Sequence, residues 1–502
     1  MKKLLRCLNV MATVLIFTSF SCGASNDIVK KPMNILLITA DDLNADSLGC
    51  YGCPVAEISP NIDKFSSGAL RFENAHVTVA ICQPSRGVLA TGLYPHHSGI
   101  MGFMHTQKNI PTIMETLGDK KYLTGVVGKV DHSTPKADYK WDFAHYRNEL
   151  GDGRSPQKYY KFCTEFFKKC RDENKPFYFM VNSHDPHRPF HITKQKLTKQ
   201  IENPSRQYQP KEVEVPGFLP DLKGVRDEMS YYFNSVKRLD DTFAKIMQAL
   251  EESGFADNTA VFFLSDNGIA VPFAKCNAYL SSTRTPLLVR VPGASKGIVD
   301  KDHFVSGIDF FPTVLDILGL KAIESLDGES FLPLLHGQTQ KNRDKVFTQI
   351  DSKAGHAAVP MRCVQDRQFG YIFNAWSKGD HYYRNANEGL SMKAMQEAAK
   401  TNPEIAARVK LFRYRVPQEL YDLKNDPDCL HNLIDNPKYR QQLIQKQKEL
   451  EEWMINTKDP LLASFNKRSN PKEMFDAASE VEAYSGLKKG SKVSKKKRKS
   501  KK

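Results

Sequence analysis

Residues 34–42 read Asn-Ile-Leu-Leu-Ile-Thr-Ala-Asp-Asp, so an apolar run ends on two adjacent carboxylates, Asp41 and Asp42. A short, continuously apolar run rich in branched side chains is typical of a strand that is buried on both faces of a parallel sheet. The stretch therefore predicts a buried β-strand over residues 34–39, with two acidic groups after its carboxyl end.

Runs of the same kind recur along the chain with helical patterns between them. Strands are predicted at residues 123–127, 177–182, 260–265 and 287–291, and helices at 229–250 and 310–318. This alternation indicates an α/β fold in which helices sandwich a large, mixed, mostly parallel sheet. Chemically capable residues follow three of these strands: Lys129, His184, Asp266 and Asn267. Because the carboxyl ends of parallel strands share one edge, we expect these groups and the two aspartates to line one pocket.

The pattern changes after residue 343. Short strands are predicted at 346–350, 362–365, 369–373 and 419–422, followed by a helix at 439–453. This mixture indicates a smaller C-terminal α+β domain with an antiparallel sheet, and 502 residues suffice for two domains. We therefore predict a catalytic domain over 33–343 and a C-terminal domain over 344–480. The polar stretch 377–403 is predicted to be an insertion, and 193–224 a long loop near the site.

The N-terminus has the pattern of an export signal. Lys2, Lys3 and Arg6 precede an apolar stretch over residues 8–20, which is too short to span a bilayer. Residues 1–24 are therefore predicted to be a signal peptide, and the protein to be periplasmic or at the cell surface. Cys22 stands where a bacterial lipoprotein would be acylated, which would give a lipid anchor; ordinary cleavage near Ala24 is the alternative.

The net charge of +15 is concentrated at the two ends of the chain. Residues 488–502 hold ten Lys and Arg and no acid, and the leader holds three more, which leaves about +2 for the body. A run of lysines without apolar residues repels itself and stays solvated, so residues 485–502 are predicted to be a disordered basic tail. A nearly neutral body argues against nucleic acid as a partner.

One of the ten cysteines stands out by its neighbours. Cys50 and Cys53 form the only close pair, and without a second pair at zinc spacing they are predicted to be ordinary thiols or one disulfide. In contrast, residues 82–86 read Cys-Gln-Pro-Ser-Arg, and a run of small and apolar residues after them ends in Thr91-Gly92.

The Cys-x-Pro-Ser-Arg string, the later Thr-Gly and the earlier Asp-Asp together resemble the type I sulfatases of the alkaline phosphatase superfamily. That resemblance implies an alkaline phosphatase-like fold and oxidation of Cys82 to formylglycine, a built-in cofactor whose hydrated aldehyde is the nucleophile. It also implies a partner enzyme, either a formylglycine-generating or an anaerobic sulfatase-maturating enzyme.

Further segments are similar to the heparan N-sulfatase (N-sulfoglucosamine sulfohydrolase) branch of that family. These are His-Asp-Pro-His-Arg at 184–188, Ser-Asp-Asn-Gly-Ile at 265–269 and Glu-Leu-Tyr-Asp at 419–422, within a similarity that runs from about residue 34 to 460. One spacing departs from the branch. His132 follows Lys129 by three positions, as in iduronate-2-sulfatases, where the N-sulfatase pattern has two.

The oxygen-bearing side chains suit a hard cation. Asp41, Asp42, Asp266 and Asn267 supply carboxylate and amide oxygens, which favour one Ca²⁺ ion over Mg²⁺. The resemblance adds the modified residue 82 as a further ligand. For Asp41 and Asp42 taken alone, a solvated surface position is the alternative.

The remaining roles follow from the charge of a sulfate group and from the family resemblance. Arg86, Lys129 and Lys275 are the predicted clamp on the sulfate oxygens, although heparan N-sulfatases have Arg at the position of Lys275. His132 is predicted to assist the hydrate and His184 to protonate the leaving atom. Four residues are placed at the substrate rim, with structural ion pairs as the alternative: His187, Arg188, His356 and Arg362.

Together these features predict an exported sulfatase that acts on a sulfated glycosaminoglycan, with the N-sulfate of glucosamine as its target. Two alternatives stay open at this point. One is an O-sulfatase acting on uronic acid or other polysaccharide sulfate esters, and the other is a catalytically silent, lipid-anchored glycan-binding protein. A phosphatase or phosphonate hydrolase is disfavoured, because the sequence offers no second set of metal-binding His and Asp residues.

Overall fold

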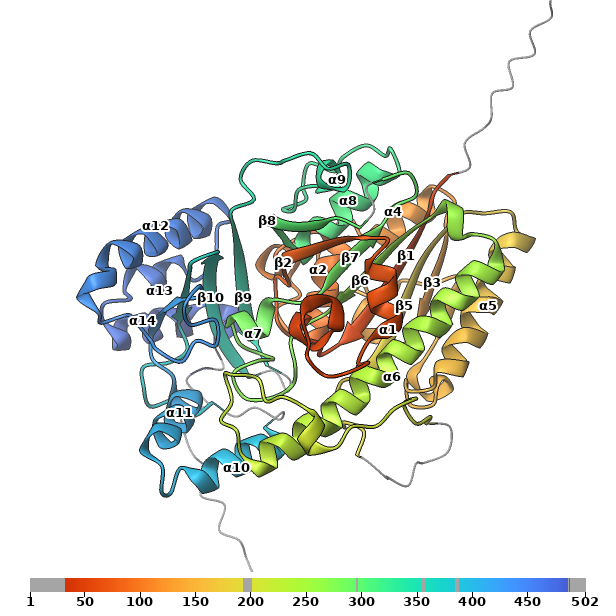
Figure 1. The fold of residues 1–502 in the computed structure, drawn as a ribbon. Coiled ribbons are helices and arrows are strands. Elements are labelled where there is room, and N and C mark those ends of the chain that lie inside the picture. Colours follow the sequence, from red (N-terminus) through yellow and green to blue (C-terminus); the bar gives the residue numbers. More distant parts are fainter. Residues whose placement is uncertain are drawn as a thin grey trace, which may run out of the picture. The chain divides into compact units, whose positions relative to one another are not determined.

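The computed structural model of this protein describes residues 32–192, 201–294, 297–353, 357–383, 388–485 and 487 (Figure 1). The predicted signal peptide with Cys22, His356, and residues 488–502 of the basic tail lie outside these ranges. Within the described ranges, no helix has both the length and the apolar composition that crossing a membrane requires.

An eight-stranded sheet organises the N-terminal part of the described chain. Seven of its strands run in one direction, and only β7 is antiparallel to its neighbours. The order across the sheet is β4 (Phe143–His145), β3 (Leu123–Val127), β5 (Phe177–Pro186), β1 (Asn34–Asp41), β6 (Thr259–Ser265), β7 (Leu287–Arg290), β2 (Leu70–His76) and β8 (Val299–Ser306). The predicted mixed, mostly parallel sheet is confirmed.

Helices cover both faces of this sheet because successive residues of a buried strand point to opposite sides. In β1, Leu36 and Ile38 join one core, which includes residues of α1 (Pro60–Ser66), α5 (Pro156–Asp172) and α6 (Lys223–Ser253). Ile35 and Leu37 join a second core with α2 (Cys82–Thr91), α4 (Ile113–Asp119) and α8 (Phe310–Ile317). Figure 1 shows α5 and α6 side by side over their face.

A second, antiparallel sheet follows in the C-terminal part, as predicted. Its order is β12 (Gln418–Asp422), β11 (Phe369–Asn374), β10 (Ala358–Asp366) and β9 (Lys345–Ser352). The helices of this part are α10 (Gly389–Ala398), α11 (Pro403–Tyr414), α12 (Arg440–Asn456), α13 (Leu462–Asn466) and α14 (Pro471–Glu480). Three short helices, α3 (Pro95–Ser98), α7 (Leu280–Thr283) and α9 (Leu332–Leu335), complete the set within the described residues.

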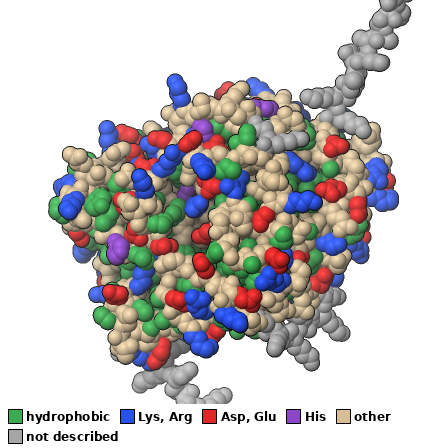
Figure 2. All heavy atoms as spheres, viewed as in Figure 1, with side chains coloured by type: hydrophobic (Ala, Val, Ile, Leu, Met, Phe, Trp, Pro, Cys, Tyr) green, Lys and Arg blue, Asp and Glu red, His purple; other side chains and the backbone are tan. Residues whose placement is uncertain are grey.

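The two sheets share one apolar core, since the core that contains Leu36 continues through Met361, Tyr371 and Leu420 of the second sheet. The proposed boundary near residue 343 falls in the connection between α9 and β9, and the division into two domains stays a prediction. On the face drawn in Figure 2, acidic and basic side chains are interspersed, in keeping with a nearly neutral body.

Candidate functional site

Four adjacent parallel strands bring the predicted site residues to one edge of the larger sheet. β1 ends at Asp41, and Asp266 follows β6 directly; Ala40 is in register with Ser265. On the other side of β1, Asp41 is in register with Pro186 at the end of β5, the strand that carries His184. Gly128 and Lys129 come directly after β3, the next strand along.

The four predicted metal ligands form a buried cluster, in which Asp41, Asp42, Asp266 and Asn267 each have 0% of their surface exposed. The Asn267 amide donates to Asp42 Oδ1 at 2.7 Å, and the Asp42 backbone N–H donates to Asp266 Oδ1 at 3.2 Å. Asp41 Oδ1, Asp42 Oδ2 and Asn267 Oδ1 accept no hydrogen bond, and Asp41 Oδ2 faces only the Lys129 ammonium, in an ion pair. Buried acceptors without a donor are costly, so these oxygens fit a hard divalent cation.

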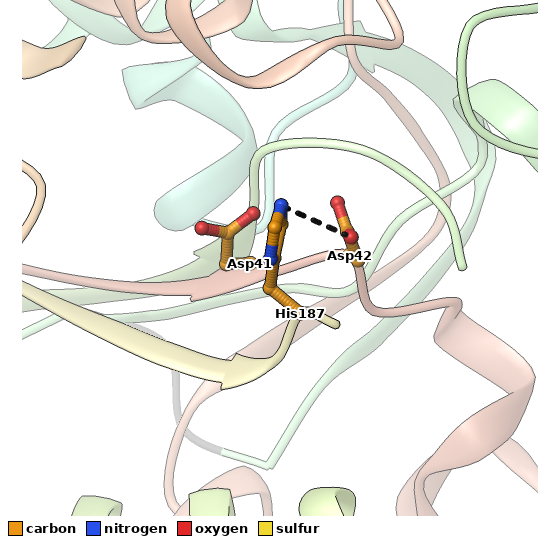
Figure 3. A group of neighbouring side chains, drawn as sticks. All are labelled: Asp41, Asp42 and His187. Carbon is orange, nitrogen blue, oxygen red and sulfur yellow. Dashed lines mark ion pairs between the residues drawn. The ribbon is translucent and has the colours of Figure 1, made fainter. Parts of the chain in front are cut away.

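His187 also belongs to this cluster, as Figure 3 shows. Its Nε2 lies 3.9 Å from Asp42 Oδ2. Asp41, Asp42 and His187 each offer one potential metal-ligating atom, and these three atoms lie within 4.8 Å of one another. Nδ1 is 2.6 Å from the Arg188 carbonyl, which can only accept, so Nδ1 carries the proton and Nε2 is left as an acceptor. The sequence placed His187 at the substrate rim; its side chain is 31% exposed, so it borders both the cluster and solvent.

Two lysines pair with the aspartates of the cluster. Lys129 forms an ion pair with Asp41, and Lys275 Nζ lies 2.5 Å from Asp42 Oδ1. Although burial opposes ionisation, Lys129 holds the pKa of Asp41 well below its usual range. Burial raises the pKa of Asp42 and, together with the charge of Asp41, raises the pKa of Asp266 to about 6. Asp42 and Lys129 also have positive φ angles of 70° and 49°, a backbone strain that non-glycine residues seldom carry.

The loop that carries Lys275 is held by the C-terminal part of the chain. Arg415, just after α11, donates hydrogen bonds to the Asn277 side chain and to the Tyr279 hydroxyl. The Tyr383 hydroxyl donates to the Cys276 carbonyl at 2.8 Å. The position of Lys275 therefore depends on residues that lie more than a hundred positions later in the sequence.

Arg86 is held by the residues around it. It is 0% exposed, and all of its guanidinium nitrogens are engaged. Nε and Nη2 contact Asp266 Oδ2 at 2.9 and 2.7 Å, and Nη2 also faces the Ala40 carbonyl at 3.5 Å. Nη1 donates to Thr39 Oγ1 and Asn182 Oδ1, both at 2.7 Å. In this structure Arg86 therefore anchors Asp266, and its predicted role as a clamp on sulfate oxygens stays a prediction.

Cys82 is the first residue of α2 and is 3% exposed. Its Sγ lies within electrostatic reach of Lys275, Lys129, Asp41 and Asp266, and burial raises the pKa of the thiol. The residue predicted to be the nucleophile is thus beside the acidic cluster.

Two histidines, the half-buried His132 and the buried His184, face the same region. His132 packs edge-on against Phe103 with 5.4 Å between ring centres, and burial together with Lys129 lowers its pKa to about 3. His184 is 5% exposed, and burial and Lys129 hold its pKa well below the usual range. Neither Nδ1 atom has a hydrogen-bond partner. The backbone of Gly153 packs directly against the His184 side chain, since a Cβ on this glycine would be 2.2 Å from His184 Nδ1.

A cavity of about 420 Å³ lies over these groups. Its wall includes the predicted residues Lys129, His132, His184, His187 and Arg188. Tyr146, Arg147 and Arg154, which no sequence motif singled out, also line it. Arg188 donates to Glu228 at 2.7 Å and to the Ala270 carbonyl at 2.8 Å, so its guanidinium is partly engaged at the rim.

Arg362 is not a rim residue, which corrects the sequence prediction. It is 0% exposed, with Nε 2.5 Å from Asp459 Oδ2 and Nη1 2.9 Å from Asp351 Oδ1. These contacts join β10 to β9 and to the segment after α12, so the ion-pair alternative holds for this arginine. His356 lies outside the described residues.

Comparison with known proteins identifies the family of the chain. The sulfatase family model matches residues 33–320, and the model "N-sulphoglucosamine sulphohydrolase, C-terminal" matches residues 270–402. Human N-sulphoglucosamine sulphohydrolase is 30% identical over 479 residues, covering 86% of this chain and 91% of that protein. An ulvan-active sulfatase of Formosa agariphila is 26% identical, covering 85% and 75%.

Among solved structures, a 2-O glycosaminoglycan sulfatase superposes with a TM-score of 0.63 at 18% sequence identity, covering 88% of this chain and 96% of that one. This likeness supports the fold alone. The family match over more than half of the chain, joined to the 30% identical relative, leads to one conclusion: the protein belongs to the sulfatase family and is a sulfuric ester hydrolase.

Proposed function

We propose that this sulfatase removes sulfate from glycosaminoglycan-type sugars and that its preferred target is the N-sulfate of glucosamine. The observation that carries the proposal is the buried acidic cluster with unpartnered oxygens next to Cys82 at the start of α2. The choice of N-sulfate is supported by the similarity to human N-sulphoglucosamine sulphohydrolase, which extends over 91% of that protein.

The metal in this proposal is one Ca²⁺ ion, held by Asp41, Asp42, Asp266 and Asn267. When bound, it would supply positive charge for the sulfate oxygens and for the developing charge at sulfur. Electrostatics favour binding of the cation together with an anionic sulfate group, because Lys129, Lys275 and Arg86 already balance the charge of the three aspartates. A divalent cation would leave the site with excess positive charge, which an anionic sulfate group offsets.

The nucleophile in this proposal is residue 82 after a maturation enzyme has oxidised its thiol to formylglycine. The hydrated aldehyde would supply two hydroxyl groups, one to attack sulfur and one to allow release of sulfate, which an unmodified thiol lacks. At the first position of α2, the residue is kept beside Lys129 and Lys275 by the helix and by the strand edge.

The chain's own groups would then position charge and move protons. Lys129 and Lys275 hold the sulfate oxygens, since each ammonium borders the cluster. His132 has an unpartnered Nδ1 that can receive a proton, and the negative charge of a bound sulfate would counteract Lys129 and raise the low pKa of His132 toward that of an effective base. His184 is neutral in the free protein; the negative charge of a bound sulfate would counteract Lys129 and raise the pKa of His184, so that it can protonate the departing nitrogen.

A second candidate is O-sulfatase activity on uronic acid or other polysaccharide esters. It is favoured by the three-residue spacing of Lys129 and His132 and by the similarity to the ulvan-active sulfatase. Export through residues 1–24 and the two-domain division at residue 343 also belong to the proposal, with a lipid anchor at Cys22 and ordinary cleavage near Ala24 as the two alternatives for the mature N-terminus.

The deciding experiment is a panel of defined saccharides that carry a single N-, 2-O- or 6-O-sulfate. The protein is coexpressed with a formylglycine-generating enzyme, and Cys82→Ala is the matched control. We expect sulfate release from N-sulfated glucosamine and none from the control. Release from O-sulfated sugars alone would replace the first candidate with the second. An intact thiol at residue 82 in protein from its native host, found by peptide mass spectrometry, would favour a silent glycan-binding protein.

A further inference from the structure

Asn182 follows the apolar stretch Phe177–Val181 within the buried strand β5, and it is 0% exposed. Its Oδ1 accepts hydrogen bonds from Arg86 Nη1 and from Thr39 Oγ1, both at 2.7 Å. Its Nδ2 donates to the Gly128 carbonyl at 2.9 Å. One amide therefore contacts the ends of β1 and β3 and the middle of α2, while its own backbone belongs to β5.

The backbone around Asn182 is equally close-fitting. The Tyr159 hydroxyl donates to the Asn182 carbonyl at 2.7 Å. On the other side, a Cβ on Gly128 would lie 2.2 Å from the same carbonyl oxygen, so only glycine allows this approach. Gly128 has a φ of 74° and directly precedes Lys129. The contact between Gly128 and Asn182 therefore determines the position of the Lys129 backbone.

Two chains of contacts lead from Asn182 to the acidic cluster. The first chain runs through Arg86, whose Nε donates a hydrogen bond to Asp266 Oδ2 at 2.9 Å. The second chain runs through Gly128 to Lys129, which pairs with Asp41. We propose that Asn182 is a positioning residue that sets the spacing of Asp266 and Asp41, and thereby the affinity of the site for its divalent cation. This inference rests on the proposed metal site and adds a residue that touches neither the cation nor the substrate.

Outer partners of metal ligands typically change metal affinity or activity by about 10–100-fold when they are removed. For Asn182→Ala we therefore expect the Ca²⁺ concentration that gives half-maximal thermal stabilisation to rise by roughly 10–100-fold. Asn182→Asp separates the two chains, because it keeps an acceptor for Arg86 but loses the donor to the Gly128 carbonyl. Asn182→Asp should show a measurable loss of Ca²⁺ affinity that differs in size from that of Asn182→Ala.

The chain offers a matched control at the opposite end of the same strands. Asn34 is 2% exposed, accepts the Phe177 N–H at 3.1 Å and donates to Thr259 Oγ1 at 3.5 Å, so it also joins β1 to β5 and β6. Asn34→Ala removes a comparable buried amide without any contact to Arg86 or Gly128. We expect it to lower the melting temperature while the Ca²⁺ midpoint stays within twofold of wild type.

The experiment is a Ca²⁺ titration followed by thermal unfolding, with kcat/KM on the saccharide panel measured in parallel. A Ca²⁺ midpoint for Asn182→Ala within twofold of wild type overturns the inference, and so does an equal shift in Asn34→Ala, which would indicate general loosening of the sheet. If Asn182→Ala does not fold, Asn182→Asp decides in the same titration. An inactive wild type that still binds Ca²⁺ would refute the proposed function and leave the positioning role to be judged by the titration.

Discussion

The contact between Gly153 and His184 gives a sharp test of the proposed site. Gly153 has a φ of 73°, and a Cβ built on it would lie 2.2 Å from Nδ1, 2.3 Å from Cγ and 2.7 Å from Cβ of His184. Rotation of the ring cannot relieve this overlap, because the histidine Cβ itself is involved. Gly153→Ala must therefore displace the whole side chain or the segment that carries it.

The expected magnitude follows from the size of the overlap. Ordinary contact begins near 3.4 Å, so the two groups must separate by roughly 1 Å, and a misplacement of about 1 Å costs on the order of 10²-fold in rate. The left-handed backbone adds about 1–2 kcal/mol of strain for alanine. Gly254 isolates that second contribution: it has a φ of 77° and no atom within 4 Å of its would-be Cβ.

The assay compares kcat/KM and melting temperature for Gly153→Ala, Gly254→Ala and wild type on the best substrate of the saccharide panel. Both variants should lose thermal stability through backbone strain, and Gly153→Ala should lose more because of the overlap with His184; only Gly153→Ala should lose roughly 10²-fold in kcat/KM. If Gly153→Ala stays within threefold of Gly254→Ala, His184 does not need its observed position, and its assignment as the proton donor fails.

Three further predictions concern metal binding, the dependence of stability on pH, and Arg362. Chelation should lower the melting temperature, and Ca²⁺ at a hundred times its Kd should restore about 2.7 kcal/mol of unfolding free energy; a melting temperature that is indifferent to Ca²⁺ would contradict the metal assignment. Burial lowers the pKa of His76 to about 3, so its contribution to stability is complete above pH 6.5 and declines as the pH falls from there. In urea unfolding, His76→Asn should therefore lose about 2 kcal/mol less than wild type between pH 7 and pH 5, and equal losses would refute this. Arg362→Leu should destabilise the fold by about 3–5 kcal/mol with an unchanged KM, because it leaves Asp459 and Asp351 without their buried partner; a raised KM in folded protein would return Arg362 to the rim.

The parts of the fold that the sequence predicted are those with a strong periodic signal. The five predicted strands of the larger sheet correspond to β1, β3, β5, β6 and β7, since each contains an almost continuously apolar run; β5 continues four residues beyond its predicted end, through Ser-His-Asp-Pro. β8 was not predicted, because it reads Val-Asp-Lys-Asp-His-Phe-Val-Ser and lies half exposed at the sheet edge. The long predicted helix is also longer in the structure, Lys223–Ser253, because its first turn begins in a polar segment without a periodic pattern.

Within the site, sequence motifs indicated residue types but not their partners. The gathering of Asp41, Cys82 and Asp266 at one edge could be predicted from strand ends and from the family resemblance. The engagement of Arg86 by Asn182 could not, because a hydrogen bond between side chains 96 positions apart leaves no local pattern. Asn182 still had one visible signal, a polar residue inside a buried strand, which must find partners for its amide.

The contact of Arg415 with the loop around Lys275 has a consequence for protein engineering. Chimeras that join the N-terminal part of one sulfatase to the C-terminal part of another would separate Asn277 and Tyr279 from the arginine to which they are fitted. A recombination boundary placed before residue 266 would take both Arg415 and the loop around Lys275 from the same parent. A boundary at the start of the second sheet would take them from different parents.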